Sequence, residues 1–340
     1  NDSPVVLDEY VFVGSSTGIH RFELNRGTQQ LDLLGVTAPS TRSDAIDVNA
    51  ESRLLYVSET TNDAVTAYTL ESDGDLSPIA TSDLGFRPVY IALDRTRNVL
   101  LSASFGDNRV GSFAIDGTGA VIEGSLATPA TGMRPHAIIT DPTASFAFVP
   151  CRDTFNVFQY RLEANGALTS NAVASADAPS GGGPRHIEFH PSLDVVYVNN
   201  EMGDSISWYS YDPTEGRLTL VDTLSSLPES VDGGDNTTAD VALTPDGQFL
   251  YVSNRGHDSI ARFSIGVDGA LEVLGHTPSP ERPRSMDIDP SGTYLAVSGQ
   301  DDNQTELFRI GPDGNLSSVH SVVTAAAPTW VEFVFVPAAP

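Results

Sequence analysis

Residues 183–209 read GPRHIEFHPSLDVVYVNNEMGDSISWY, a stretch that contains three strand-like segments and two turns. Apolar and polar residues alternate over residues 185–189, and a β-branched run follows at residues 195–199. Short segments of this kind, bounded by Pro, Gly and Asp, are typical of half-buried antiparallel strands. The first two segments would form a hairpin, in which the start of one strand and the end of the next share an edge. We therefore expect Arg185 and Glu201 to lie close together.

An aromatic residue ends the third strand of a unit that recurs seven times along the chain. Successive aromatics are 46, 45, 47, 49, 54 and 45 residues apart: Phe22, Tyr68, Phe113, Tyr160, Tyr209, Phe263 and Phe308. Turns containing Gly follow them, and Asn-Gly or Asp-Gly between strands is a strong hairpin signal because both residues tolerate positive φ. An apolar residue after each turn begins a predicted fourth strand, with Val121 as that residue in the third unit. Four short antiparallel strands in about 45 residues are the pattern of a propeller blade.

The two ends of the chain complete each other. The first unit, which begins at Tyr10, lacks a first strand, and residues 328–337 (PTWVEFVFVP) supply one at the C-terminus. Pairing the two closes the ring and removes a sheet edge that would otherwise invite aggregation. The sequence therefore predicts an all-β fold in a single domain over residues 1–340. The domain is a seven-bladed β-propeller with four antiparallel strands per blade, closed by the C-terminal strand joining the N-terminal blade.

The charge balance is strongly acidic. Asp and Glu number 45 against 18 basic residues, all of them Arg, which gives a formal net charge of −27. Such a surface repels nucleic acids and anionic membranes, so neither is expected as a partner. The excess of acidic residues is typical of a soluble protein that functions at high salt or outside the cell. We therefore expect a protein that is either exported (periplasmic or secreted) or cytoplasmic in a salt-adapted organism. No feature points to a particular oligomeric state.

Several common catalytic and binding motifs are absent from the sequence. The single cysteine, Cys151, excludes an internal disulfide and a thiolate metal cluster. His, Cys and Asp do not cluster at metal-binding spacing. There is no Gly-x-Ser-x-Gly elbow of a serine hydrolase, and the glycine run at residues 181–183 precedes a strand, whereas phosphate-binding glycine loops open a helix. We therefore expect no metal and no cofactor.

A residue that recurs from blade to blade is more often structural than functional. Asp or Asn lies five residues before the aromatic in five units, and we expect these residues to form turns capped by local side-chain hydrogen bonds: Asp63, Asn108, Asp204, Asp258 and Asn303. The seven aromatics are likewise expected in the core between blades. Function is therefore expected where blades depart from the repeat.

Three consecutive blades depart from the repeat on one face. The fourth opens with RPH (134–136), the fifth opens with PRH (184–186) and adds Glu201, and the sixth ends its second strand with NRGH (254–257). These positions can converge at the mouth of the channel, where an imidazole, a carboxylate and guanidinium groups would form an acid–base pocket for an anionic ligand. His186 directly follows Arg185, so we expect it to point to the other side, into the packing between blades.

At these positions the sequence resembles the seven-bladed lactonase family, which includes the propeller type of 6-phosphogluconolactonase and the fungal carboxymuconate lactonizing enzymes. The resemblance runs from Tyr10 to Pro337 and is carried by RPHAIITDP (134–142), GPRHIEFHP (183–191), NNE (199–201) and YVSNRGHDSI (251–260). It implies functional roles for His136, Arg185, Glu201 and Arg255. The chain departs from the family pattern near Tyr90, where relatives often have a histidine, and at Cys151-Arg152, where relatives usually have Asp-Leu-Gly.

The resemblance implies a cofactor-free hydrolase that opens a small anionic or polyhydroxy lactone, in the manner of 6-phosphogluconolactonase. His136 and Glu201 are the candidates for general base and general acid, and Arg185 and Arg255 would hold a substrate carboxylate or stabilise the oxyanion. Further substrate contacts are expected from rim and loop residues, namely Arg87, Arg134, Asn254, His257 and Arg284.

Two other functions fit the same residues. One is ring closure of a muconate-type dicarboxylate by a lactonizing enzyme (a cycloisomerase). The other is non-catalytic binding of a ligand or protein, because this fold hosts many functions. The residues also have structural interpretations: His136 as a hydrogen-bonded rim histidine, Glu201 as an ion-pair partner that holds hairpins in register, and His257 as a loop histidine bonded locally.

An irregular acidic loop lies in the longest interval between aromatics, at residues 225–238 (SSLPESVDGGDNTT). It connects the fourth strand of one blade to the first strand of the next, and this connection crosses the face on which first strands begin. The loop would therefore either cover the pocket as a lid or form an ordinary surface insertion.

Overall fold

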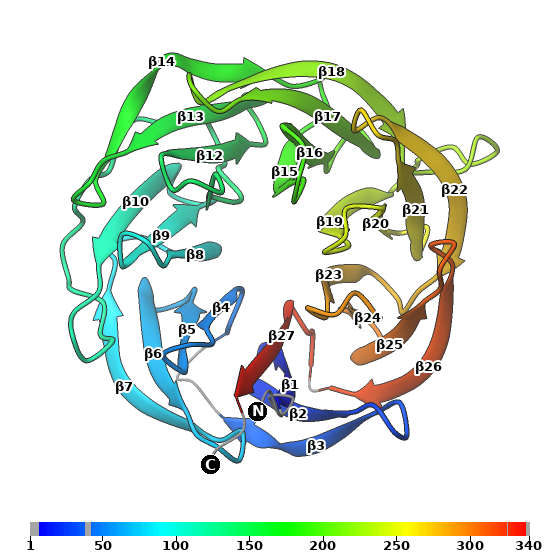
Figure 1. The fold of residues 1–340 in the computed structure, drawn as a ribbon, viewed down its shortest axis with the longest axis horizontal. Helices are drawn as coiled ribbons and strands as arrows, with labels where there is room; N and C mark the ends of the chain where they lie inside the picture. The colour runs from blue at the N-terminus through cyan, green and yellow to red at the C-terminus, as the bar shows by residue number, and fades with distance from the viewer. Residues whose placement is uncertain (1–6, 38–41, 325, 338–340) are drawn as a thin grey trace, which may run out of the picture.

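The alternating segments of the sequence form antiparallel strands grouped into seven sheets, which stand as blades around a central channel (Figure 1). The computed structural model describes residues 7–37, 42–324 and 326–337. Within these residues six sheets have four strands and the third has three. In each blade the first strand lines the channel and the last strand lies at the outer edge (Figure 1). The predicted seven-bladed β-propeller is confirmed.

From the channel outward, the first blade contains β27 (Trp330–Pro337), β1 (Leu7–Gly14), β2 (Ile19–Asn25) and β3 (Gln30–Thr37). The second contains β4 (Ile46–Asn49), β5 (Leu54–Glu59), β6 (Ala64–Leu70) and β7 (Leu76–Asp83), and the third β8 (Tyr90–Asp94), β9 (Val99–Ser104) and β10 (Arg109–Ala114). The fourth contains β11 (Ile139–Thr140), β12 (Phe146–Cys151), β13 (Asn156–Leu162) and β14 (Leu168–Asp177), and the fifth β15 (Pro184–Phe189), β16 (Val195–Asn200), β17 (Ser205–Asp212) and β18 (Arg217–Ser225). The sixth contains β19 (Thr237–Leu243), β20 (Phe249–Arg255), β21 (Ser259–Ile265) and β22 (Leu271–Pro278), and the seventh β23 (Pro283–Ile288), β24 (Tyr294–Gly299), β25 (Gln304–Ile310) and β26 (Leu316–Val323). None of the residues that the structure describes belongs to a helix that could cross a membrane.

The third blade departs locally from the four-strand pattern. Val121, the predicted start of its fourth strand, forms only an isolated bridge with Ile115, and the segment makes one further bridge to β10. Gly124 lies within this segment and adopts a φ angle of 87°, which is foreign to a regular strand. The outer edge of this blade is therefore irregular.

The ring closes as predicted. β27 pairs antiparallel with β1 along its whole length, from Leu7 opposite Pro337 to Gly14 opposite Trp330. The first and last strands that the structure describes therefore share one blade (Figure 1), and the junction has no open sheet edge between the first and last units.

The predicted aromatics lie in the core between blades. All seven are at most 4% exposed: Phe22, Tyr68, Phe113, Tyr160, Tyr209, Phe263 and Phe308. Burial of a side chain of this size stabilises the fold by about 1.5–3 kcal/mol relative to exposure. The recurring aromatic is therefore a packing element of each blade.

Neighbouring blades are also joined by tyrosine hydroxyls. Tyr197 on β16 donates a hydrogen bond to the carbonyl oxygen of Gly269, in the outer hairpin of the next blade, at 2.9 Å. The same contact recurs at other blade junctions: Tyr10 with Ser72, Tyr56 with Gly119, and Tyr251 with Gly314. Each bond satisfies polar groups inside a mostly apolar interface, which is where an unpaired group costs most.

The recurring Asp and Asn residues form tight turns, as predicted, but among the described residues the predicted local side-chain hydrogen bond is seen only at Asp258, whose Oδ1 accepts the backbone N–H of Gly256. All five adopt positive φ, between 44° and 58°, a conformation that Asn and Asp tolerate better than most residues. Their side chains also reach the following blade: Asn108 Oδ1 accepts the backbone N–H of Arg134, and Asp258 Oδ1 accepts that of Arg282. These residues therefore help to fix the point at which the next first strand begins.

Acidic side chains on the first strands line the channel. Asp47 Oδ2 accepts the backbone N–H of Leu93, and Asp287 Oδ2 accepts that of Phe333, both at 2.6 Å. These carboxylates therefore bind backbone N–H groups on the edges of neighbouring first strands. The cavity in this part of the channel has a volume of about 340 Å³. Because burial disfavours the charged form, the pKa of Glu188 is raised to about 8 and that of Asp287 to about 7.

Replacing Tyr197 by Phe removes one hydrogen bond between blades and keeps the aromatic side chain in place. We expect the free energy of unfolding to fall by about 1 kcal/mol, because the Gly269 carbonyl loses its donor. Tyr209→Phe is the matched control, since its hydroxyl is buried with no hydrogen-bond partner among the described residues. Denaturant unfolding compares the two variants, and an equal loss in both would contradict the assignment of this bond.

Replacing Glu188 by Gln should change how stability depends on pH. The pKa of Glu188 is about 8 in the folded protein against an ordinary value of 4.5, so its proton stabilises the folded state fully below pH 4.5. That contribution is lost as the pH rises from 4.5 towards 8, whereas Gln has no proton to lose. We therefore expect the variant to gain stability relative to wild type between pH 5 and pH 8, by on the order of 1 kcal/mol. Thermal unfolding at both pH values measures this, and a difference that stays constant would argue against a raised pKa.

Candidate active site

One mouth of the channel gathers the starts of first strands and the ends of second strands. In the fifth blade the backbone N–H of Glu201 donates to the carbonyl oxygen of Gly183 at 2.7 Å, which brings Glu201 to the start of β15, where Arg185 lies. In the sixth blade Arg255 is the last residue of β20 and pairs with Thr237 at the start of β19. The hairpin geometry therefore brings these charged residues to the same end of two adjacent blades.

Glu201 and Arg255 form a buried ion pair. Arg255 Nη2 donates to Glu201 Oε1 at 2.7 Å and to the Thr238 carbonyl oxygen at 3.0 Å. Arg152 Nη1 lies 3.6 Å from the other carboxylate oxygen of Glu201. Burial alone would raise the pKa of Glu201, but the positive charges of Arg185 and Arg255 outweigh it and lower the pKa. Glu201 is therefore an ionised carboxylate at neutral pH.

Arg185 is among the most deeply buried charged residues in the described part of the chain, with 2% of its surface exposed. Its Nη1 donates to the carbonyl oxygen of Ala239 and contacts His186 Nε2 at 3.1 Å. Burial and the neighbouring charge of Arg255 lower the pKa of Arg185 to about 9. The guanidinium group is therefore still protonated at neutral pH.

His136 lies between two other rings at this mouth. Its ring centroid is 5.4 Å from that of Phe105 and 5.3 Å from that of His186. Burial, with the added charge of Arg185, holds the pKa of His136 well below its ordinary value. His136 is therefore a neutral imidazole, which can accept a proton.

Five buried polar atoms of this cluster have no hydrogen-bond partner among the described residues. They are His136 Nδ1, Arg185 Nε, Glu201 Oε2, Arg255 Nε and Arg284 Nε. A buried polar atom left without a partner costs about 1–3 kcal/mol, so such atoms concentrate where a ligand or water completes the structure. With three of the five on guanidinium groups, the cluster suits an anionic or oxygen-rich ligand. No group of three or more His, Cys, Asp or Glu side chains in the described ranges is arranged to hold a metal ion.

Arg284 joins this cluster from the seventh blade. Its Nη2 lies 3.7 Å from Asp44 Oδ1, and burial lowers its pKa to about 10, with Arg255 and Glu201 among the charges that act on it. Arg134 and Arg87 lie on the exposed rim instead. Arg134 is 3.0 Å from an Asp153 carboxylate oxygen, and Arg87 is 3.8 Å from one of Asp107.

The structure does not bring Asn254 and His257 into the cluster. The Asn254 side-chain amide donates to the Ser226 carbonyl oxygen at 2.8 Å and accepts the Ser226 hydroxyl at 2.7 Å. His257 Nδ1 contacts the Ser259 hydroxyl at 2.7 Å, and its ring faces His276 on the outermost strand, β22, at 6.1 Å. Both side chains therefore hold the local loop in place.

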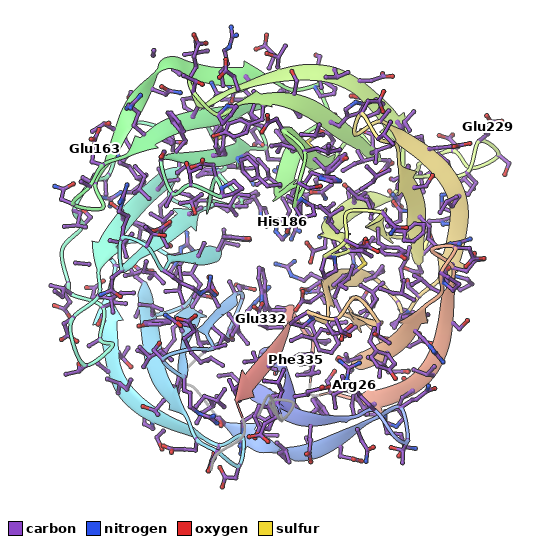
Figure 2. All side chains as sticks on the ribbon, viewed as in Figure 1. Arg26, Glu163, His186, Glu229, Glu332 and Phe335 are labelled. Carbon is purple, nitrogen blue, oxygen red and sulfur yellow. The ribbon has the colours of Figure 1, made fainter. Side chains whose placement is uncertain are left out.

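His186 lies where the sequence did not predict it. The expected position in the packing between blades is wrong, because His186 lines the channel cavity and points into the central opening (Figure 2). The register of β15 against β16 shifts between Pro184 and Ile187, so strict alternation of side chains fails at Arg185 and His186. A bulge of this kind has no clear sequence signal, although the motif around it marked the strand as unusual.

The long loop of the sixth blade does not cover this mouth. Glu229 near its tip lies at the outer edge of the molecule, far from the central opening (Figure 2). At the base of the loop, Asn236 Nδ2 donates to Asp204 Oδ1 at 2.7 Å. The loop is therefore a surface insertion in this structure, and the alternative of a lid is wrong.

Comparison with known proteins gives a consistent result. A family model described as Lactonase, 7-bladed beta-propeller, matches residues 9–333. The 6-phosphogluconolactonase of Yersinia pestis (strain Pestoides F) is 31% identical over 281 residues, covering 82% of this chain and 83% of that protein. The protein of the same name from Yersinia enterocolitica is 31% identical over 290 residues, covering 83% and 85%.

Solved structures share the architecture. The periplasmic gluconolactonase of Pseudomonas aeruginosa superposes with a TM-score of 0.89 at 22% identity, covering 98% of this chain and 100% of that one. At this identity the likeness supports the fold alone. The family model spans almost the whole propeller, and relatives exceed 30% identity over more than four fifths of the chain, so this protein belongs to the seven-bladed β-propeller lactonase family.

Proposed function

We propose that the protein hydrolyses a small sugar lactone of the 6-phosphogluconolactone type. The observation that carries the proposal is the set of unpaired buried atoms around an ionised carboxylate and a neutral imidazole at one channel mouth. The curated relatives named 6-phosphogluconolactonase support this substrate class. They favour hydrolysis over ring closure of a muconate-type dicarboxylate and over non-catalytic binding.

His136 is the residue best suited to move the proton. Water attacks the lactone carbonyl carbon and loses a proton to the neutral imidazole, through the Nδ1 atom that has no partner among the described residues. The ring C–O bond then breaks, and the imidazolium returns the proton to the leaving alkoxide. One residue thus serves as base and then as acid.

Glu201 is not suited to the role of general acid. A carboxylate with a lowered pKa, paired with Arg255, has no proton to donate near neutral pH. Its charge instead orients Arg255, and Oε2, which lies 3.6 Å from Arg152 Nη1 but has no hydrogen-bond partner among the described residues, can accept a hydrogen bond from the attacking water or a sugar hydroxyl.

The buried arginines supply positive charge where negative charge develops. Arg185 and Arg255 each keep an unpaired Nε in a site with little exposure to water, where a fixed donor stabilises an oxyanion more than it would in solvent. Arg284, at the seventh blade, adds a third cation for a phosphate or carboxylate distant from the reacting carbonyl.

His136→Ala and Glu201→Gln should each lower kcat/KM for 6-phosphoglucono-δ-lactone by about 10²-fold or more, because each removes a group that acts on the reacting water. Base uptake in a pH-stat measures the rate. His257→Ala is the matched histidine control and should keep wild-type activity, since its ring lies at the outer strand. Full activity in both site variants would exclude the mechanism, provided that thermal unfolding shows intact folds.

Arg284→Ala should raise KM for a phosphorylated lactone by about tenfold and leave KM for glucono-δ-lactone nearly unchanged, because a charged hydrogen bond to phosphate is lost. The Glu201–Arg255 pair remains in this variant, so the two effects are separable. Arg87→Ala, on the exposed rim, is the control. An equal rise for both substrates would mean that Arg284 does not sense the phosphate.

A further inference from the structure

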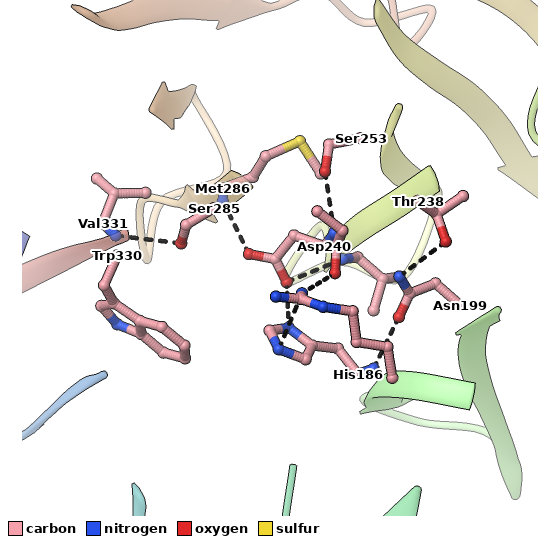
Figure 3. A network of polar contacts seen from close by, with 12 residues as sticks. His186, Asn199, Thr238, Asp240, Ser253, Ser285, Met286, Trp330 and Val331 are labelled. Atoms are coloured by element: carbon pink, nitrogen blue, oxygen red, sulfur yellow. Dashed lines mark hydrogen bonds and ion pairs between the residues drawn. The ribbon is translucent and has the colours of Figure 1, made fainter. Parts of the chain in front are cut away.

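A chain of polar contacts links Asp240, His186 and Arg185 across two blades, and Figure 3 shows Asp240 beside His186. Asp240 Oδ1 lies 2.6 Å from His186 Nδ1, and His186 Nε2 lies 3.1 Å from Arg185 Nη1. The backbone N–H of His186 donates to Asn199 Oδ1 at 2.8 Å, which fixes the residue on β15. All three members of the chain are at most 7% exposed.

Asp240 is held as a carboxylate that can only accept hydrogen bonds. Besides His186, its oxygens accept the backbone N–H groups of Val241 at 3.0 Å and Met286 at 2.9 Å. Burial alone would raise the pKa of Asp240, but His186 and Arg185 outweigh it and lower the pKa. A carboxylate with these partners requires the proton of the imidazole to be on Nδ1.

The tautomer of His186 determines whether its Nε2 atom presents an acceptor or an N–H donor to Arg185 Nη1. With Nδ1 protonated, His186 Nε2 is a bare acceptor, and Arg185 Nη1 can donate to it. Burial and the charge of Arg185 lower the pKa of His186, so the ring stays neutral in this position. The opposite tautomer would place an N–H against an N–H and remove one of the two acceptors that hold Arg185 Nη1.

Arg185 depends on these acceptors for its orientation. The interactions that hold its guanidinium group are those of Nη1 with the Ala239 carbonyl oxygen and with His186, while Nε is buried and unpaired among the described residues. Two acceptors on one nitrogen restrict the plane of the group, and Nε remains available to a ligand.

We propose that Asp240 and His186 are positioning residues that fix the tautomer facing Arg185 and so aim its guanidinium group at the oxyanion of the lactone. The inference rests on the proposed lactone hydrolysis and adds a specific cause for the orientation of one catalytic arginine. Because Arg185 acts on charge that develops in the transition state, disturbing its aim should lower kcat more than it raises KM.

Three variants separate positioning from packing. In Asp240→Asn the side-chain amide can donate to Nδ1, which moves the imidazole proton to Nε2, and we expect kcat to fall by about 10²-fold. In His186→Gln the Oε1 atom replaces Nε2 as an acceptor without a choice of tautomer, and we expect kcat to stay within about tenfold of wild type. The double variant should be no slower than His186→Gln alone, because in this proposal Asp240 sets the aim of Arg185 through the histidine.

The tautomer itself can be observed without any substrate. Long-range ¹H–¹⁵N correlation spectra of histidine-labelled protein at pH 7.5 should show His186 protonated on Nδ1 in wild type and on Nε2 in Asp240→Asn. Thermal unfolding of every variant, with His186→Ala included in the set, identifies activity losses that are due to unfolding. An imidazolium or an Nε2–H tautomer in wild type would overturn the proposal, as would additive losses from Asp240→Asn and His186→Gln.

Failure of the proposed function is distinguishable from failure of this inference. If the wild type opens none of the lactones in a panel, lactone hydrolysis is wrong, and 6-phosphogluconate serves as the probe instead. Calorimetry should then show Asp240→Asn weakening its Kd by about tenfold, an effect absent in the His186→Gln background. Equal Kd values for wild type and Asp240→Asn would overturn the positioning role.

Discussion

Closure of the ring by β27 pairing with β1 is the constraint on which the rest of the molecule depends. A closed ring holds the seven first strands around one channel (Figure 1). His136, Arg185 and Arg284 belong to the fourth, fifth and seventh blades, and only a fixed ring brings them together. Aromatic packing and tyrosine hydrogen bonds between blades keep that spacing rigid, which suits a site that must be aimed before the ligand arrives.

Charge balance is the feature that favours this mouth as the proposed ligand site. Guanidinium groups are costly to bury unless they are paired with a negative charge. Arg255 contacts Glu201 at 2.7 Å, and Arg284 approaches Asp44 at 3.7 Å. Burial, together with the neighbouring charge of Arg255, lowers the pKa values of Arg185 and Arg284. In a protein with a net charge of −27, such a cluster of guanidinium groups would attract anionic ligands that the rest of the surface repels.

Most of the fold could be predicted from the sequence repeat, and part of the candidate site could be predicted from the positions that depart from the repeat. Aromatic spacing predicted seven blades, and the hairpin argument placed Glu201 beside Arg185, because both depend on local periodicity. Local periodicity could not predict the bulge in β15 that turns His186 to the channel, nor the outward course of the loop at residues 225–238. Asn254 looked functional from its place beside Arg255, but neighbouring serines satisfy its amide, a contact visible only in three dimensions.

A crystal structure with bound 6-phosphogluconate, the product of the proposed reaction, tests the central claim most directly. The account predicts the anion at the mouth formed by the fourth to seventh blades, with its carboxylate within hydrogen-bond distance of Arg185 Nε and Arg255 Nε. Its phosphate should lie towards Arg284. Binding within the acidic channel cavity beside Glu188, or at the outer loop beside His257, would contradict the account.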